Sequence, residues 1–324
     1  MADELDLLRR ANPVPANSAH TGDGPLDQHG ERVLNRLLHD PHPGRRRRRT
    51  RLAWSLAACA VVMATVLAAL LGSTGTTPAI AAPRPLVVSP HSAAVPLDRL
   101  AELAEAAAAD GSPRLRKGTH VQTWSLGMSD DRPPITLPEE RVVRWHPDAS
   151  RTEVVVATDP LHPGRPVLTD EDDGPRRVAD GQVLSRRTYP PSWSDAPPEA
   201  EPPHEPAQLR DYLAETVRTG TLTTAELLDA TKELLDHWTL GARESAALVR
   251  LFADAPGLRP AGRVTDRLGR PGQAYVYDAH GARRMLILDP ATGTVLGLET
   301  TFRVAAPEYG VQSGDVMDYS AWLP

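Results

Sequence analysis

The feature that most constrains this chain is an uninterrupted apolar run at residues 52–71, LAWSLAACAVVMATVLAALL. These 20 residues carry no charge, and only Ser55 and Thr65 are polar. An α-helix rises about 1.5 Å per residue, so the run covers roughly 30 Å, the thickness of the hydrocarbon core of a bilayer. Helices of water-soluble domains are rarely apolar on every face over such a length. The run therefore predicts a single transmembrane helix.

Basic residues flank this run on one side only. Immediately before it stand Arg45, Arg46, Arg47, Arg48, Arg49 and Arg51, whereas no basic residue follows it before Arg84. Basic flanks remain in the cytoplasm. We therefore expect a single-pass protein of the cell membrane, with a cytoplasmic N-terminus and residues 72–324 outside.

An arginine run can also indicate nucleic-acid binding, but the charge balance argues against that interpretation. The whole chain has a net charge of −6. Residues 1–51 hold ten arginines against seven acidic residues, whereas residues 52–324 hold 26 basic against 35 acidic residues. We expect the arginines to contact anionic lipid of the bilayer and expect no nucleic-acid partner.

A cleaved signal peptide is the competing interpretation of the apolar run. Ala79-Ile80-Ala81 matches the small-residue pattern of a cleavage site. The apolar run is longer than a usual signal segment, and about fifty residues precede it. We favour an uncleaved anchor and keep cleavage after Ala81 as the alternative.

The remaining sequence divides into a head, a linker and an exported domain. Residues 1–44 predict a short cytoplasmic head with two amphipathic helices, and residues 45–51 are the arginine-rich juxtamembrane segment. Residues 72–96, rich in Ala, Thr, Ser and Pro, predict a linker. Residues 97–324 predict an extracytoplasmic α+β domain, in which helices pack on one face of an antiparallel sheet.

Apolar periodicity and turn residues locate the elements of that domain. The expected helices are 97–109, 207–217, 223–238 and 242–253, the third opened by a capping box at Thr223 and Glu226. The expected strands are 120–126, 140–146, 151–158, 182–188, 261–267, 273–278, 283–289 and 294–304. Residues 160–179 predict a polar loop, and residues 189–206, with seven prolines, predict a stiff connector.

The head exposes more aliphatic surface than it can bury. Two short helices cannot form a core of their own. We expect their large aliphatic side chains to form a partner-binding surface: Leu5, Leu7, Leu8, Val33, Leu34, Leu37 and Leu38. The alternative is that these helices lie on the membrane surface beside the arginines.

Motifs of catalysis or metal binding are absent from the sequence, so we expect no enzymatic activity and no cofactor. The single cysteine, Cys59, excludes an intrachain disulfide. Residues 170–173 are four contiguous acidic residues, which favour a solvated loop over a calcium site. His39 and His42 could supply half of a metal site, but Pro41 between them breaks the helix that would align their rings.

Aromatic residues are scarce, at 4% of the chain, so the tryptophans stand out. Trp124, Trp145, Trp193 and Trp238 could line a cleft for an apolar ligand outside the membrane. The favoured alternative is that they fill the core. The segment Asp289-Pro290-Ala291-Thr292-Gly293 predicts a structural turn between strands.

Several segments together resemble a known family. They are DELDLLRRANPVP at residues 3–15, GERVLNRLL at 30–38, the arginine run before one span, and ILDPATGTVLGLE at 287–299. The chain resembles an uncharacterised actinobacterial family of single-pass membrane proteins, often encoded beside extracytoplasmic-function sigma factors. The order of elements in the exported part is also similar to lipoprotein-carrier-like half-barrels used by envelope-stress sensors.

This resemblance implies a transmembrane, anti-sigma-like regulator. Its cytoplasmic partner would be a sigma factor or another regulator, and its exported domain would be a sensor. The alternative is a membrane-tethered, extracytoplasmic ligand-binding or envelope-scaffold domain without a signalling role.

The charge asymmetry makes the topology testable. A reporter that fluoresces only in the cytoplasm should stay dark when fused after Pro324, because residues 72–324 are expected outside. The same reporter fused after Gly44 should be bright and serves as the control. A bright fusion after Pro324 would reverse the expected orientation.

Overall fold

The computed structural model describes residues 83–324, apart from 130–131, 172–173, 192–193 and 195. By its contacts the chain divides into two units, Met1–Leu70 and Leu71–Pro324, and the described residues belong to the second. The expected head, the juxtamembrane arginines and the expected span at 52–71 all lie outside the described residues. Within the described part, no helix has the length and apolarity needed to cross a membrane.

The described domain contains four α-helices, one 3₁₀ helix and twelve strands. The helices are α4 (Leu97–Ala107), α5 (Pro206–Thr216), α6 (Thr224–His237), α7 (Ala242–Ala253) and the 3₁₀ helix η1 (Pro307–Tyr309). The strands before α5 are β1 (Arg116–Ser129), β2 (Arg132–Trp145), β3 (Arg151–Ala157), β4 (Val167–Glu171), β5 (Gly174–Val178) and β6 (Gln182–Tyr189). Those after α6 are β7 (Trp238–Thr239), β8 (Arg259–Thr265), β9 (Pro271–Ala279), β10 (Ala282–Leu288), β11 (Val295–Phe302) and β12 (Val316–Trp322).

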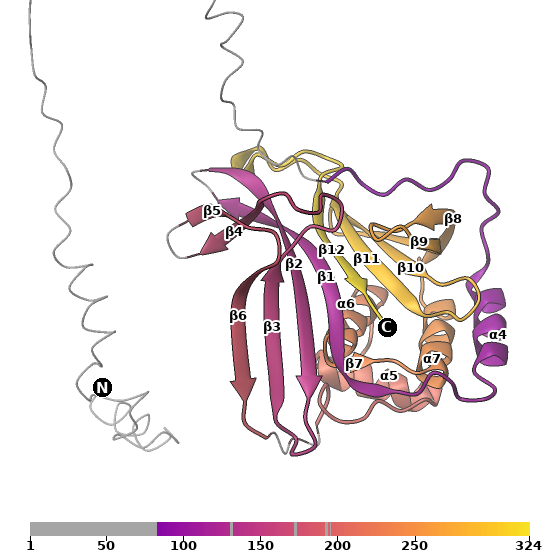
Figure 1. Cartoon of the computed structure of the whole chain (residues 1–324). Helices are drawn as coiled ribbons and strands as arrows, with labels where there is room; N and C mark the ends of the chain where they lie inside the picture. Colours follow the sequence, from indigo (N-terminus) through magenta and orange to yellow (C-terminus); the bar gives the residue numbers. More distant parts are fainter. Residues whose placement is uncertain (1–82, 130–131, 172–173, 192–193, 195) are drawn as a thin grey trace, which may run out of the picture. The chain divides into compact units, whose positions relative to one another are not determined.

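One antiparallel sheet organises the domain. Its strand order is β6-β3-β2-β1-β12-β11-β10-β9-β8, with β7 paired to the start of β1, and β4-β5 form a separate hairpin. The N-terminal and C-terminal groups of strands meet at β12, which pairs with both β1 and β11 (Figure 1). The predicted α+β fold with a mostly antiparallel sheet is confirmed.

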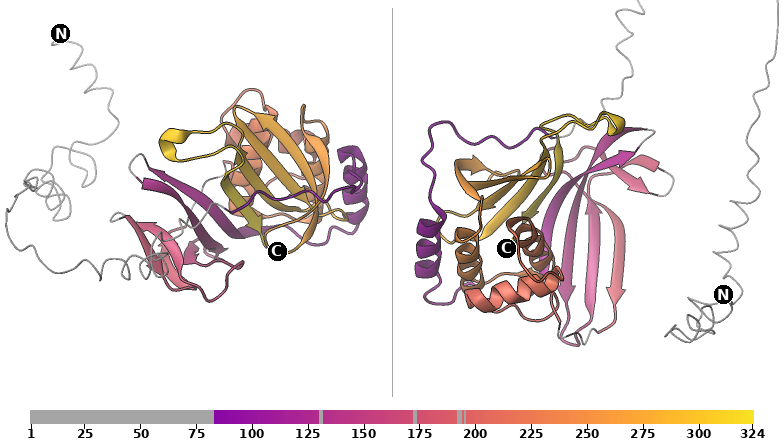
Figure 2. Two further views of the ribbon diagram at one scale, coloured as in Figure 1. Left: turned by 90° about the horizontal axis from the view of Figure 1, so that it is seen from above. Right: turned by 180° about the vertical axis from the view of Figure 1, so that it is seen from behind.

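The four α-helices pack on one face of the C-terminal half of this sheet (Figure 2). Strand β10 supplies apolar side chains to both faces of the sheet, because successive residues of a strand point to opposite sides. Leu286 and Leu288 join the cluster under the helices, whereas Met285 and Ile287 join a second cluster on the opposite face. The sheet is therefore apolar on both faces in this half.

The third layer is a strap formed by residues 83–96, which crosses the sheet before α4 (Figure 2). Leu86 and Val88 pack against the second cluster, and the Ser89 N–H donates to the Arg263 carbonyl at 2.7 Å. Beneath the strap lies a buried ion pair between Arg267 and Glu299. The second half of the expected linker is thus packed against the domain.

The helix boundaries follow from local chemistry. The predicted capping box is confirmed at α6: the Thr223 hydroxyl accepts the Glu226 N–H at 3.3 Å, and the Glu226 carboxylate accepts the Thr223 N–H at 2.8 Å. The apolar positions Leu227, Leu228, Leu234 and Leu235 recur at helical spacing and are all buried.

Two regions differ from the sequence-based expectation. Residues 160–179, expected to be a loop, contain the hairpin β4-β5, whose Val167 and Val178 pack against Ala157. Strand β12 was missed, although Met317, Tyr319 and Ala321 alternate with Asp318 and Ser320 as in a half-buried strand. It is a strand because both of its edges pair with β1 and β11, and only tertiary structure supplies those partners.

The turn between β10 and β11 gives a matched test of packing. Gly293 and Gly269 both have positive φ, at 69° and 80°. A Cβ at Gly293 would meet Val249 Cγ2 at 2.7 Å and Ala104 Cβ at 2.9 Å, whereas one at Gly269 has open space. We expect Gly269→Ala to cost about 1–2 kcal/mol from the left-handed backbone alone. Gly293→Ala should cost about 1–3 kcal/mol more because it overpacks α4 and α7.

The measurement is denaturant unfolding of the two purified full-length variants beside the parent protein. Equal free energies of unfolding for the two variants would show that this turn does not press on the helices.

Candidate functional site

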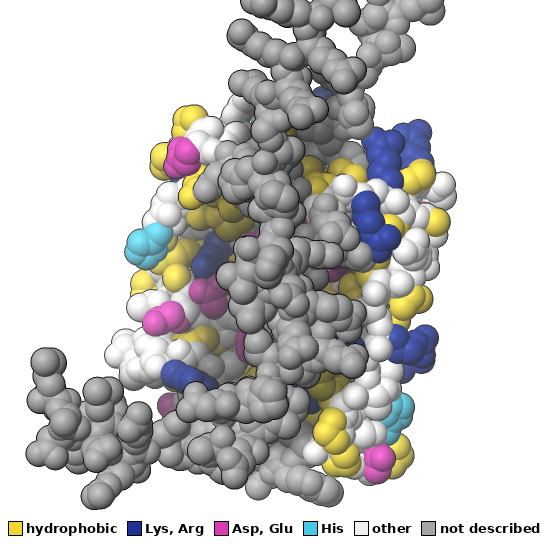
Figure 3. All heavy atoms as spheres, turned by 90° about the vertical axis from the view of Figure 1, so that its left-hand side faces the viewer, with side chains coloured by type: hydrophobic (Ala, Val, Ile, Leu, Met, Phe, Trp, Pro, Cys, Tyr) yellow, Lys and Arg dark blue, Asp and Glu magenta, His cyan; other side chains and the backbone are white. Residues whose placement is uncertain are grey.

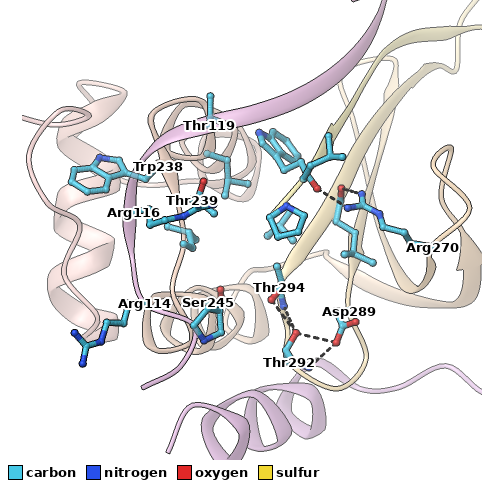
Figure 4. Close-up of a pocket in the computed structure, with 18 residues that line it drawn as sticks. Arg114, Arg116, Thr119, Trp238, Thr239, Ser245, Arg270, Asp289, Thr292 and Thr294 are labelled. Atoms are coloured by element: carbon cyan, nitrogen blue, oxygen red, sulfur yellow. Dashed lines mark hydrogen bonds between the residues drawn. The ribbon is translucent and has the colours of Figure 1, made fainter. Parts of the chain in front are cut away.

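A cavity of about 540 Å³ lies where β1 begins and β12 ends, beside the helices (Figure 4). Its walls come from three places: the start of β1, the segment from α6 through β7 to α7, and the ends of the C-terminal strands. The residues that line it are Pro113, Arg114, Arg116, Thr119, Leu235, Trp238, Thr239, Leu240, Ser245, Arg270, Asp289, Thr292, Thr294, Val295, Leu296, Trp322, Leu323 and Pro324.

Two buried tryptophans dominate the apolar part of the wall. Trp238 is 7% exposed and Trp322 is 6% exposed. The indole N–H of Trp238 donates to the Pro198 carbonyl at 2.9 Å. The indole N–H of Trp322 is buried and has no hydrogen-bond partner among the described residues. A buried donor without an acceptor is costly, so this N–H lowers the stability of the wall.

Most polar groups of this cavity are already satisfied by the fold. Asp289 accepts hydrogen bonds from the backbone N–H groups of Ala291 and Thr292 and from the Thr292 hydroxyl, at 2.8–2.9 Å. These bonds agree with the structural turn predicted there. Arg270 donates to the carbonyls of Trp322 and Leu296 at 2.6 and 2.7 Å and pairs with Asp266 (Figure 4). Both side chains therefore stabilise the wall of the cavity.

A second cavity, of about 380 Å³, adjoins the first. The two share Arg116, Thr119, Thr239 and Pro324. The second cavity has a cationic lining, to which Arg116, Lys117, His120 and Arg144 contribute, and none of its described lining residues is acidic. The site thus combines an apolar chamber with a positively charged one.

Lys117 lines the second cavity and also lies close to Trp238 of the core. Its ammonium lies 3.8 Å from the ring centroid of Trp145 and 5.5 Å from that of Trp238, within range of cation–π attraction. Burial lowers the pKa of Lys117, while Glu199 opposes that shift. Arg151, which also faces the Trp145 ring, pairs with Glu199 at 3.4 Å. Lys117 is thus held in place between two rings.

The arginines that line the cavities differ in whether their side chains have partners. Arg114, Arg116 and Arg144 are exposed, and their side chains form no hydrogen bond or ion pair with the rest of the described chain. In Figure 4, the Arg114 guanidinium extends away from the middle of the first cavity. Arg116 and Arg144 both line the second cavity, so they are the cations best placed to meet a negatively charged group there.

The four tryptophans singled out from the sequence lie in different places. Trp124 is buried in the core, with its ring tilted against Tyr319 at a centroid distance of 5.5 Å, and it also lines a third cavity of about 290 Å³. Trp238 belongs to the core and also lines the first cavity, and Trp145 lines the second. For Trp238 the core and ligand interpretations therefore both apply. Trp193 lies outside the described residues.

The other predicted site residues fall largely outside the described chain. This applies to Leu5, Leu7, Leu8, Val33, Leu34, Leu37 and Leu38, to the arginines at 45–49 and 51, and to His39 and His42. Of the acidic run at 170–173, Asp170 and Glu171 belong to β4. In the described part, no group of three or more His, Cys, Asp or Glu side chains could hold a metal ion.

Sequence reasoning missed Arg116, Arg144 and Trp322. Nothing in the local sequence separates these two arginines from the chain's other arginines, because their role depends on cross-strand position: Arg144 faces Gly118 across the β1–β2 ladder. Comparison with known proteins adds no assignment: no protein-family profile matches the chain, and no curated protein sequence matches it.

The two tryptophans of the first cavity offer a matched pair. Trp238→Phe removes a hydrogen bond to Pro198, whereas Trp322→Phe removes a donor without a partner. Both lose similar ring area. We therefore expect Trp238→Phe to lower the free energy of unfolding by about 1 kcal/mol more than Trp322→Phe does.

Thermal and denaturant unfolding of the ligand-free variants measure this difference. An equal or larger loss for Trp322→Phe would show that its indole N–H is satisfied in the folded protein.

Proposed function

We propose that this chain is a single-pass, anti-sigma-like membrane regulator whose exported domain is a sensor for an apolar ligand. The observation that carries the sensor role is the 540 Å³ cavity, which lies in the size range of small-molecule sites. Its apolar lining includes Leu235, Trp238, Leu240, Leu296 and Trp322.

The regulatory half of the proposal is supported by the sequence. A charge-free run of 20 residues follows the six arginines, and the head before them contains seven large aliphatic residues. Burying a leucine contributes roughly 1.5–3 kcal/mol, so several could offset the cost of ordering two short helices on a partner. A sigma factor is the partner that the family resemblance implies.

We also propose that the sheet is a lipoprotein-carrier-like half-barrel. What supports this is an antiparallel path of nine strands with the four described α-helices on one face, enclosing a cavity at the junction of the two halves.

A tethered ligand-binding domain without signalling is the second candidate. One observation favours it: both cavities are lined entirely by residues 113–324, so ligand binding does not require the head. The two candidates therefore differ in the head and agree about the cavity.

An experiment on the cytoplasmic head distinguishes the regulator from the tethered domain. Full-length protein in nanodiscs of neutral lipid should capture an extracytoplasmic-function sigma factor, and Leu34→Asp should weaken capture at least tenfold by placing a charge in the apolar surface. Leu26→Asp, in the glycine-rich segment between the two expected helices, is the matched control and should bind normally.

Capture that is unaffected by Leu34→Asp contradicts the proposed surface. A head that binds only when anionic lipid is added, and to no sigma factor, supports the tethered domain instead.

A further inference from the structure

We propose that the two adjoining cavities form one binding site for an anionic amphiphile. Its alkyl chain would occupy the apolar cavity, and its phosphate or carboxylate group would bind Arg116 and Arg144. This inference rests on the proposed function, because it names the chemical class of ligand for the same site.

Continuity between the cavities is the first support. They share Arg116, Thr119, Thr239 and Pro324, so the apolar cavity and the cationic one lie side by side at the start of β1. Thr239 donates its hydroxyl to the Gly118 carbonyl at 2.9 Å, which fixes β7 against β1 at this junction. The boundary between apolar and cationic chambers is therefore part of the sheet.

The charge of the second cavity is the next support. Arg116, Lys117 and Arg144 contribute three positive charges, and no described lining residue there is acidic. His120 is engaged by Glu140, and Lys117 lies between two tryptophan rings. Arg116 and Arg144 remain without partners in the described domain. A guanidinium binds phosphate or carboxylate through two parallel hydrogen bonds, so these two side chains specify an anion.

The apolar cavity sets the other half of the ligand. Asp289 and Arg270, two charged residues of its wall, are engaged by the turn and by the wall, and the two other charged residues there, Arg114 and Arg116, lie at the start of β1. What remains is largely aliphatic and aromatic surface. A free inorganic anion would leave this surface empty, and an uncharged apolar molecule would leave Arg116 and Arg144 unpaired.

Other charged surfaces give weaker grounds for a site. Asp278 forms ion pairs with Arg259, Arg283 and Arg303, and hydrogen bonds from Arg283 and Arg303 lower its pKa to about 2, so these cations are already engaged. On the side of the domain that carries β6, basic, acidic and hydrophobic side chains are intermixed among the visible described residues (Figure 3). A third cavity, of about 290 Å³, combines apolar walls with one arginine, Arg165, but its lining also includes the acidic Asp159.

The test compares three probes on the full-length protein in neutral-lipid nanodiscs, with empty nanodiscs as the blank. Decyl phosphate supplies chain and anion, decanol supplies the chain alone, and inorganic phosphate supplies the anion alone. Isothermal titration calorimetry should give at least tenfold tighter binding for decyl phosphate than for either of the other probes.

Substitutions locate the head group. The double variant Arg116→Gln with Arg144→Gln should weaken decyl phosphate binding at least tenfold and leave decanol binding within twofold of the parent. Arg116→Lys with Arg144→Lys keeps the charge and should retain part of the affinity, which separates charge from folding. Arg263→Gln, at an exposed arginine of β8 on the far edge of the sheet, is the matched control and should change neither.

The outcomes distinguish failure of the anionic-amphiphile inference from failure of the proposed sensor cavity. Equal binding of decanol and decyl phosphate overturns the anionic head group and leaves the apolar sensor standing. Binding of inorganic phosphate as tight as that of decyl phosphate identifies a plain anion site and overturns the amphiphile. Binding of none of the probes overturns this inference and also removes support for the sensor cavity.

Discussion

The pairing of β12 with β1 on one side and β11 on the other is the interaction on which the domain depends. Tyr319 lies opposite Trp124 on β1 and opposite Glu299 on β11, and Trp322 lies opposite Val121. In the sheet, the strands before α5 and the strands after α7 meet only at β12 among the described elements. The same strand ends at the first cavity, which lies where the two halves of the sheet are joined.

The two faces of the C-terminal half are closed by different means. Helices α4 to α7 cover one face with aliphatic side chains, whereas the strap at residues 83–96 covers the other and is tied by polar contacts. Glu299 accepts the Leu86 N–H at 2.9 Å, and Arg267 donates to the Arg84 carbonyl at 3.0 Å. Desolvation raises the pKa of Glu299 although Arg267 lowers it, which indicates that burying this pair is costly. The same pair holds two backbone groups of the strap, the Leu86 N–H and the Arg84 carbonyl.

The division of polar groups explains why the cavities suit binding. Side chains such as Asp289, through its Oδ1, and Arg270 stabilise the turns and strand ends that form the walls. Arg116 and Arg144 have no comparable structural partner in the described chain. The fold therefore leaves positive charge beside an apolar chamber, and this combination gives the proposed sensor its ligand chemistry.

The sequence by itself determined the elements whose signal is local. The apolar periodicity of α7, the capping box at Thr223 and the turn at Asp289 depend on neighbours within a few residues, so their positions could be predicted. The expected span at 52–71 is equally local, as a matter of length and charge. Tertiary structure decided the rest. Strand β12 needs partners about 20 and 200 residues away, and the cavities assemble Arg116, Arg144, Trp238 and Trp322 from distant parts of the chain. No local pattern encodes which side chains a sheet brings together, because that depends on long-range pairing and register.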